Sequence, residues 1–178
     1  STMMFFTEQG RLYWTKVYEL PEGNRQSKGR ALQNMINIQK GDKVCAFIHV
    51  KNLSDMEYVQ NHYLIFATKN GLMKKTTLEA YSRPRANGII ALGLREDDRL
   101  IRVTLTDGNS QMLVASYNGK VVRFPEDTVR PMGRTATGVR AIKLDEDGKD
   151  RVVGMICVEE SSKESVLVIS EKGFGKRT

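Results

Sequence analysis

The sequence predicts an all-β fold in which small four-stranded antiparallel sheets repeat as the blades of a propeller, here an incomplete set of about three to four. Four times an apolar run ends at a Ser or Thr, passes two polar residues and turns on a glycine: MMFFTEQG, LIFATKNG, MLVASYNG and VLVISEKG. Those glycines, Gly10, Gly71, Gly119 and Gly173, are 61, 48 and 54 residues apart. This spacing is typical of a repeat architecture.

Each repeat begins with a hairpin. The apolar runs are short and rich in β-branched and aromatic residues, which favours strands over helices. Asn70-Gly71 and Asn118-Gly119 predict type I′ turns, in which both central residues have positive φ. The second strands then follow as RLYWTKVY, LMKKTTL and KVVRF.

The second half of each repeat begins with a polar, basic connection that ends at Gly29, Gly88 or Gly138. A third strand is expected in RALQNMINI, IIALGL and VRAIKL, and a fourth in KVCAFIHV, RLIRVTL and RVVGMICV, with an acidic turn containing DK or DR between them. We therefore expect residues 1–178 to form part of one domain, with repeats at about 3–59, 60–111, 112–165 and an incomplete 166–178. An irregular β-sandwich or barrel is the alternative fold.

Composition narrows the class of protein. No run approaches the roughly 20 apolar residues of a membrane span, and no signal peptide is evident, so we expect a cytoplasmic protein that does not contact membranes. Cys45 and Cys157 lie in apolar runs without CxxC spacing and are expected to be buried free thiols. With only two histidines, no zinc site or other cofactor is expected.

Several motifs that suggest catalysis have simpler explanations. GFGKRT lacks the Walker pattern, because Lys176 is followed by Arg177, and a hairpin turn is expected there. Asp97-Asp98 and residues 145–147 recur at one place in the repeat and are expected to form polar turns, while His49 is expected to be packed and neutral. The aromatic residues beside basic positions could stack on bases, but packing between blades is favoured for Tyr13, Trp14, Tyr18 and Phe124. We expect no catalytic residue.

The charge is concentrated in one part of the repeat. The chain carries a net charge of +7, and residues 16–30, 74–88 and 120–140 hold 13 basic and 5 acidic residues, so the rest of the chain is close to neutral. Equivalent positions in a propeller fall on one continuous rim, which would match duplex phosphates better than a small ligand. The candidate DNA-binding residues are Lys16, Arg25, Lys28, Arg30, Lys74, Lys75, Arg83, Arg85, Lys120, Arg123, Arg130, Arg134, Arg140, Lys176 and Arg177.

Four segments carry a family resemblance: VYELPEGNRQSKGRALQN, NGLMKKTTLEAYSRPRANG, NGKVVRFPEDTVRPMGRTATGVRAIKL and GFGKRT. Together they resemble the C-terminal domain of the DNA gyrase A subunit over essentially the whole chain. The resemblance implies a β-pinwheel of six blades that share strands. It also implies a basic rim that wraps double-stranded DNA, so that the gyrase A catalytic core and the gyrase B subunit introduce negative supercoils. The domain would be a non-catalytic, nucleoid-associated part of an ATP-dependent type IIA topoisomerase.

The sequence departs from that family at one motif. The glycine- and arginine-rich gyrase box is absent, and NRQSKGR is only a degenerate echo of it. We therefore expect the box upstream of Ser1 and the chain to be an internal piece of the domain. The corresponding domain of topoisomerase IV is the close alternative, and a propeller that serves as a protein-interaction platform is the alternative from another class.

Overall fold

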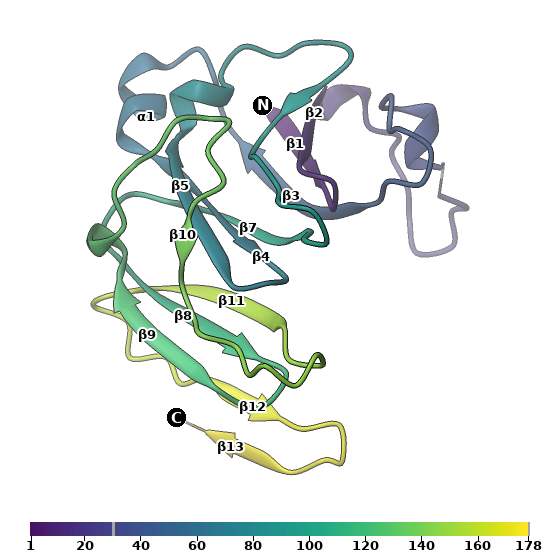
Figure 1. Ribbon diagram of the computed structural model, residues 1–178. Helices are drawn as coiled ribbons and strands as arrows, with labels where there is room; N and C mark the ends of the chain where they lie inside the picture. The colour runs from purple at the N-terminus through teal and green to yellow at the C-terminus, as the bar shows by residue number, and fades with distance from the viewer. Residues whose placement is uncertain (30, 178) are drawn as a thin grey trace.

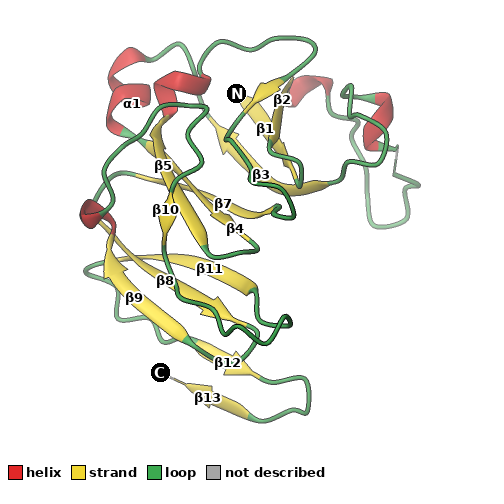
Figure 2. Cartoon of the chain, in the orientation of Figure 1, coloured by secondary structure: helices red, strands yellow, loops and turns green. Residues whose placement is uncertain are grey.

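The computed structural model describes residues 1–29 and 31–177, and its regular secondary structure is mostly strands (Figure 2), so the all-β prediction is confirmed. The thirteen strands among the described residues are β1 Thr2–Thr7, β2 Arg11–Lys16, β3 Val44–Val50, β4 Tyr63–Thr68, β5 Leu72–Thr77, β6 Ile89–Ile90, β7 Leu100–Thr106, β8 Ser110–Ser116, β9 Val121–Pro125, β10 Val139–Arg140, β11 Val152–Glu159, β12 Leu167–Ile169 and β13 Gly175–Arg177. The helical elements are short: α1 Met56–Asn61 and the 3-10 turns η1 Val17–Glu19, η2 Leu32–Asn34, η3 Leu78–Tyr81 and η4 Glu126–Thr128.

The strands form four antiparallel sheets that follow one another in an arc from the N-terminus to the C-terminus (Figure 1). In strand order the first sheet is β3-β1-β2-β6, the second is β10-β5-β4-β7, the third is β11-β8-β9 and the fourth is β12-β13. The hairpin expected in GFGKRT is therefore present, with Leu167 opposite Arg177 in its register.

Neighbouring repeats are joined by a shared strand. β6 pairs with β2, with Arg11 opposite Ile90, and β10 pairs with β5, with Leu72 opposite Arg140. The third strand of a repeat thus completes the sheet of the repeat before it. Residues 31–38 have no earlier sheet in this chain to join, and the strand expected there is wrong: that segment contains the 3-10 turn η2.

The recurrent Ser or Thr has a structural role in each hairpin turn. The N–H of Gly71 donates to the Thr68 carbonyl at 3.2 Å, and the N–H of Leu72 donates to Thr68 Oγ1 at 3.1 Å. The same pair of bonds forms at Thr7, Ser116 and Ser170. The type I′ prediction is wrong, because Asp97 alone among the described non-glycine residues has positive φ. Only the glycine is left-handed, as in a type I turn followed by a G1 bulge.

The acidic turns brace these hairpins, which confirms their structural interpretation. Asp98 Oδ1 accepts the N–H groups of Asn70 at 3.0 Å and Arg99 at 2.8 Å. Asp42 and Asp150 accept the equivalent pairs of N–H groups in the first and third repeats. The Asp of each DK or DR dipeptide therefore satisfies backbone donors in a turn.

The core lies between the sheets. One apolar cluster, which includes Phe6, Leu12, Leu64 and Phe66, fills the junction of the first and second sheets. A second cluster, which includes Ile65, Met73, Met112 and Ile142, fills the junction of the second and third sheets. The second sheet is consequently buried on both faces. Two predicted site residues on its β5 strand, Lys74 and Lys75, are therefore buried.

Candidate nucleic-acid interface

Three segments, here called the connections, run from the second strand of one sheet toward the strand that follows. The first connection is residues 17–43, the second is residues 78–88 and the third is residues 126–138. The second and third each cross to the outer edge of the preceding sheet, where β6 and β10 pair (Figure 1). Most of the predicted basic residues lie in these connections or on the strands beside them.

The connections are linked in order along the molecule: the first bonds to the second, and the third bonds to the segment that follows the second. Asn37 Nδ2 of the first donates to Asn87 Oδ1 of the second at 3.4 Å. The Arg134 guanidinium of the third donates to the Ile90 carbonyl in β6, which directly follows the second connection. The Gly93 N–H donates to the Ala136 carbonyl at 3.1 Å. These contacts join the three connections into one continuous strip.

Most of the candidate residues are on the surface. Arg25 and Lys28 of the first connection, Arg83 and Arg85 of the second and Arg130 of the third are exposed, whereas Arg134 is half-buried. Exposed candidates on the strands are Lys16, Arg123, Arg140, Lys176 and Arg177, and Lys120 is exposed just before β9. Arg30 lies outside the described residues. The connections therefore present exposed cations from all three repeats.

Lys74 is a correction to the sequence prediction. Its side chain is fully buried, because β5 is covered on both faces by neighbouring sheets. Its Nζ lies 4.8 Å from the centre of the Phe66 ring and donates to Tyr81 Oη at 3.1 Å, to the Ala91 carbonyl at 2.5 Å and to the Arg134 carbonyl. A group enclosed in this way cannot contact DNA.

The surroundings of Lys74 change the acidity of two groups. Burial, and secondarily the nearby Arg134 cation, lower the pKa of Lys74 from 10.5 to about 7. Burial also raises the pKa of Tyr81 well above its ordinary value of 10.0. Tyr81 therefore remains a neutral phenol, and its hydroxyl donates to the Ala91 carbonyl at 2.7 Å.

Lys75 is the second correction. It is 4% exposed and faces the junction of the second and third sheets. There its Nζ lies 3.4 Å from Glu126 Oε1 and 4.3 Å from the centre of the Tyr63 ring. Glu126 is fully buried and also accepts bonds from the Thr106 hydroxyl and from the Ser110 N–H at 3.1 Å. Lys75 thus holds two sheets together.

Lys120 is exposed, but its charge is already engaged. Its ammonium donates to Asp145, and Asn118 donates to both Asp145 and Asp147 at 2.8 Å. The hydrogen bond to Asp145, together with nearby carboxylates, raises the pKa of Lys120. Among the predicted residues it is a weak candidate for phosphate contact, because binding DNA would require it to leave this carboxylate.

The aromatic, histidine and cysteine side chains considered in the sequence differ in how far they are buried. Tyr13 is buried and Trp14 is half-buried, with its Nε1 donating to the Tyr81 carbonyl at 3.1 Å, whereas Tyr18 is 81% exposed and does not pack as expected. His49 is exposed, which contradicts the packed position predicted for it. Its neighbours in β3 alternate between the two faces of the first sheet, and its own position faces solvent. Cys45 and Cys157 are free but only half-buried, and burial raises the pKa of the Cys45 thiol to about 12.

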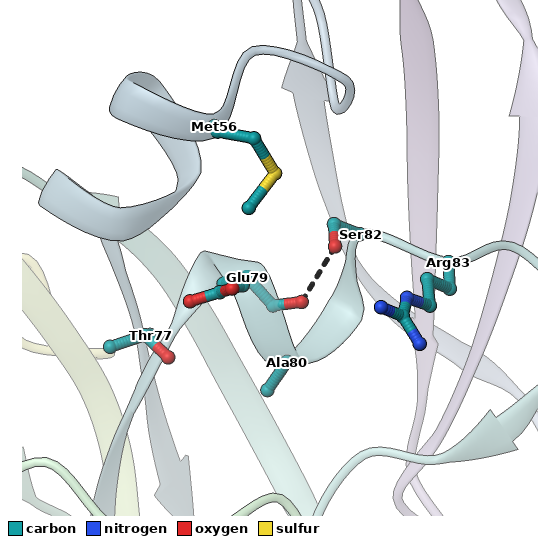
Figure 3. A pocket seen from close by; sticks show the side chains of 6 residues that line it. All are labelled: Met56, Thr77, Glu79, Ala80, Ser82 and Arg83. Carbon is teal, nitrogen blue, oxygen red and sulfur yellow. Dashed lines mark hydrogen bonds between the residues drawn. The ribbon is translucent and has the colours of Figure 1, made fainter.

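A shallow hollow lies beside α1 and the second connection (Figure 3). Met56, Thr77, Glu79, Ala80, Ser82 and Arg83 line it, and Ser82 Oγ donates to the Glu79 carbonyl at 2.7 Å. The lining mixes single acidic, basic and apolar side chains without a convergent polar set, which does not favour a small-molecule site. Within residues 1–29 and 31–177, no helix has the length and apolar character needed to cross a bilayer.

Comparison with known proteins identifies the family. The family model described as "DNA gyrase C-terminal domain, beta-propeller" matches residues 1–51, 62–107, 111–159 and 164–178. The chain belongs to this family. Over 99% of its length it is 44% identical to the DNA gyrase A protein of Staphylococcus aureus, of which it covers 19%.

Solved structures show the same fold in gyrase and topoisomerase IV. The C-terminal domain of DNA topoisomerase IV superimposes with a TM-score of 0.84 at 29% identity, with 99% of this chain and 52% of that chain covered. The DNA gyrase A C-terminal domain gives a TM-score of 0.77 at 23% identity, with 99% and 53% covered. The β-pinwheel prediction is confirmed, and the chain spans about half the length of these domains.

Proposed function

We propose that this gyrase-family chain binds and bends duplex DNA, without preference for base sequence, along the strip formed by its three connections. The observation that carries the proposal is the contact of the connections in order, each with exposed arginine or lysine side chains. Cations spaced along a curved edge can follow a row of phosphates and favour bent DNA.

The elements available also favour backbone contact over base reading. The one α-helix among the described residues, α1, carries Glu57 and no basic side chain, so it is unsuited to the major groove. The short strands at the outer edge, β6 and β10, are two residues long. Affinity would therefore come from phosphate contacts, which fix position and carry no sequence information.

In the whole protein, this module would wrap DNA beside the gyrase A catalytic core and gyrase B, so that strand passage yields negative supercoils. It would contribute no catalytic group and need no cofactor, and the complete enzyme would act on chromosomal DNA in the cytoplasm. The 44% identity to a gyrase A protein supports this assignment. The higher TM-score to the topoisomerase IV domain keeps that enzyme as the second candidate.

The test measures binding and bending of duplexes of increasing length while salt is varied. We expect tighter binding to longer duplexes and a loss of at least about a hundredfold in affinity between 50 and 200 mM salt. Charge reversal at Arg83, Arg85 and Arg130 should weaken binding for every DNA sequence alike. The matched control reverses three exposed lysines outside the strip, Lys143, Lys149 and Lys163, and should have a much smaller effect.

Two outcomes would change the assignment. Affinity that is independent of both salt and duplex length would contradict wrapping through phosphate contacts and would support a protein-interaction platform. In the assembled enzyme, the strip variant should introduce fewer negative supercoils into relaxed plasmid than the control variant. An enzyme that introduces none with the wild-type module would support the topoisomerase IV assignment.

A further inference from the structure

Lys74 lies beneath the strip and joins three separate elements. Its three N–H groups have three acceptors: the Tyr81 phenol in η3, the Ala91 carbonyl after β6 and the Arg134 carbonyl in the third connection. A protonated lysine has three donors and no acceptor, so this arrangement satisfies it completely. The buried ammonium links the second sheet to a segment 60 residues further along the chain.

The third connection is fastened on both sides of this point, to β5 and to the loop that follows β6. The Met132 N–H donates to the Lys75 carbonyl at 2.7 Å, and the Ala136 carbonyl accepts from the Gly93 N–H at 3.1 Å. At Gly138 the contact is so close that a Cβ would lie 2.2 Å from the Met73 carbonyl oxygen. Residues 132–138 therefore lie directly on β5 and its neighbours, and Lys74 is the charged group at the centre of this contact.

Loss of the ammonium would affect its acceptors unequally. The Ala91 carbonyl would keep the Tyr81 hydroxyl as a donor at 2.7 Å. The Arg134 carbonyl has no other hydrogen-bond donor among the described residues. Since an unpaired carbonyl in a protected site is unfavourable, the backbone at Arg134 would be expected to move toward water.

We propose that Lys74 is a positioning residue for DNA binding, which holds the third connection in place so that Arg130 continues the row begun by Arg83 and Arg85. This inference rests on the proposed function. Lys74 touches no DNA itself and acts through the backbone of Arg134.

The other sheets fasten their connections differently. Counted from the turn glycines, Lys74 corresponds to Tyr13 in the first sheet and to Val122 in the third, neither of which has an ammonium group. The second connection has a bond of its own to the first sheet, where Arg11 Nη2 donates to the Asn87 carbonyl at 3.0 Å. Lys74 also donates to Tyr81 of the second connection, but that connection keeps the Arg11 bond and the Trp14 bond to the Tyr81 carbonyl. A variant at Lys74 should therefore loosen the third connection more than the second.

The experiment compares Lys74→Met with Arg130→Gln in the purified protein, first without DNA and then with a long duplex. Lys74→Met should raise amide hydrogen exchange at residues 132–138 by about tenfold or more and raise exchange in the second connection by much less. It should also lower DNA affinity several-fold. Arg130→Gln, which removes an exposed cation, should lower affinity without changing exchange.

A double-mutant cycle then shows whether Lys74 acts through the third connection. The affinity losses of Lys74→Met and Arg130→Gln should combine less than additively, whereas Lys74→Met and Lys176→Gln, which lies in the fourth sheet, should be additive. Additive losses in both pairs would overturn the proposal. So would unchanged affinity in a Lys74→Met variant with raised exchange.

If Lys74→Met does not fold, a milder variant can be used in its place. Tyr81→Phe removes one acceptor of Lys74 while keeping the ring, and should raise exchange at residues 132–138 to a smaller extent. Unchanged exchange in this variant would count against the proposal. If the wild type does not bind duplex at all, the proposed function fails first, and this is visible before any variant is compared.

Discussion

Between the first and second sheets, Trp14, Leu78 and Val50 occupy the positions that Lys75, Glu126 and Thr106 occupy between the second and third. Trp14 and Lys75 each come four residues after a turn glycine, and Leu78 and Glu126 each come seven after. The first set belongs to or packs against an apolar cluster, whereas the second set forms a buried ion pair with a hydroxyl donor. One backbone framework therefore supports two chemically different junctions.

The difference shows which junction tolerates substitution. Apolar contacts contribute roughly in proportion to the area that they bury, so partial loss has a graded effect. A buried ion pair behaves otherwise, because the loss of one partner leaves the other charged and without compensation. We therefore expect the second junction to be more sensitive to single changes, although apolar residues such as Met73 and Ile142 also stabilise it.

The largest expected effect is at Glu126. Glu126→Ala leaves the Lys75 ammonium buried without its carboxylate and should lower the free energy of unfolding by about 3–5 kcal/mol in urea titration. The double variant Lys75→Met, Glu126→Leu, which copies the apolar character of the first junction, should recover most of that loss. A cost below about 1 kcal/mol for Glu126→Ala would mean that the ion pair does not hold this junction.

The two junctions also explain which parts of the structure could be read from the sequence. The glycine turns, the aspartates that accept backbone N–H groups beside them and the hairpin strands recur along the chain, so periodicity alone locates them. Burial of Lys74 and Lys75 does not follow from a basic pattern, because it depends on a sheet being covered on both faces. The available signal was alignment of the repeats, since Lys74 corresponds to Tyr13 and Val122, and Lys75 to Trp14.

Other parts of the structure needed tertiary information. That β6 and β10 join the sheet of the previous repeat was implied by the family resemblance and is confirmed, but no local sequence pattern encodes which sheet a strand joins. In the sequence Glu126 is only one of the acidic residues of the third repeat, yet its carboxylate stabilises the junction of the second and third sheets. Arg123 corresponds to Lys75 but is exposed, because the sheet after it contains only β12 and β13. Position in the repeat therefore predicts local structure better than it predicts exposure.

Glycines at the two junctions give the second test. Gly71 has φ +91° and a Cβ there would lie 2.8 Å from the Ile142 carbonyl oxygen, while a Cβ at Gly10 would lie 3.0 Å from the Leu92 side chain. Gly119 has φ +87°, and a Cβ there would meet no atom within 4 Å beyond its chain neighbours. Gly119→Ala is therefore the matched control for backbone strain alone. We expect Gly119→Ala to cost about 1–2 kcal/mol, and Gly71→Ala about 1–3 kcal/mol more. Gly10→Ala should fall between them, because a side-chain end yields more easily than a backbone oxygen. Equal losses of unfolding free energy at Gly71 and Gly119 would show that this contact between sheets adds nothing.

The third test uses pH, because Lys74 is a titratable group buried at the first junction. Its pKa is about 7 in the fold against 10.5 as a free side chain, so unfolding at pH 7–9 takes up a proton. Stability should therefore rise with pH in this window, by up to about 1.4 kcal/mol per pH unit. The comparison stops near pH 9, since the raised pKa values of Cys45 and Tyr81 lower stability as pH rises further. In Lys74→Met this rise should be absent, and the difference between the two proteins, measured by urea unfolding at each pH, isolates the lysine. A rise that persists in Lys74→Met would assign it to another group.

The smallest expected effect concerns the hydrogen bond of the Trp14 side chain at the apolar junction. Trp14→Phe keeps an aromatic ring against the first cluster but removes the Nε1 donor to the Tyr81 carbonyl at 3.1 Å. The loss should be about 1 kcal/mol, with some further cost from the smaller ring, and should remain well below that of Glu126→Ala at the second junction. Urea unfolding of the two variants side by side measures the contrast. If Trp14→Phe destabilised the protein as much as Glu126→Ala, the apolar junction would depend on its hydrogen bond as strongly as the ionic junction depends on its carboxylate. The graded response expected from buried area would then be wrong.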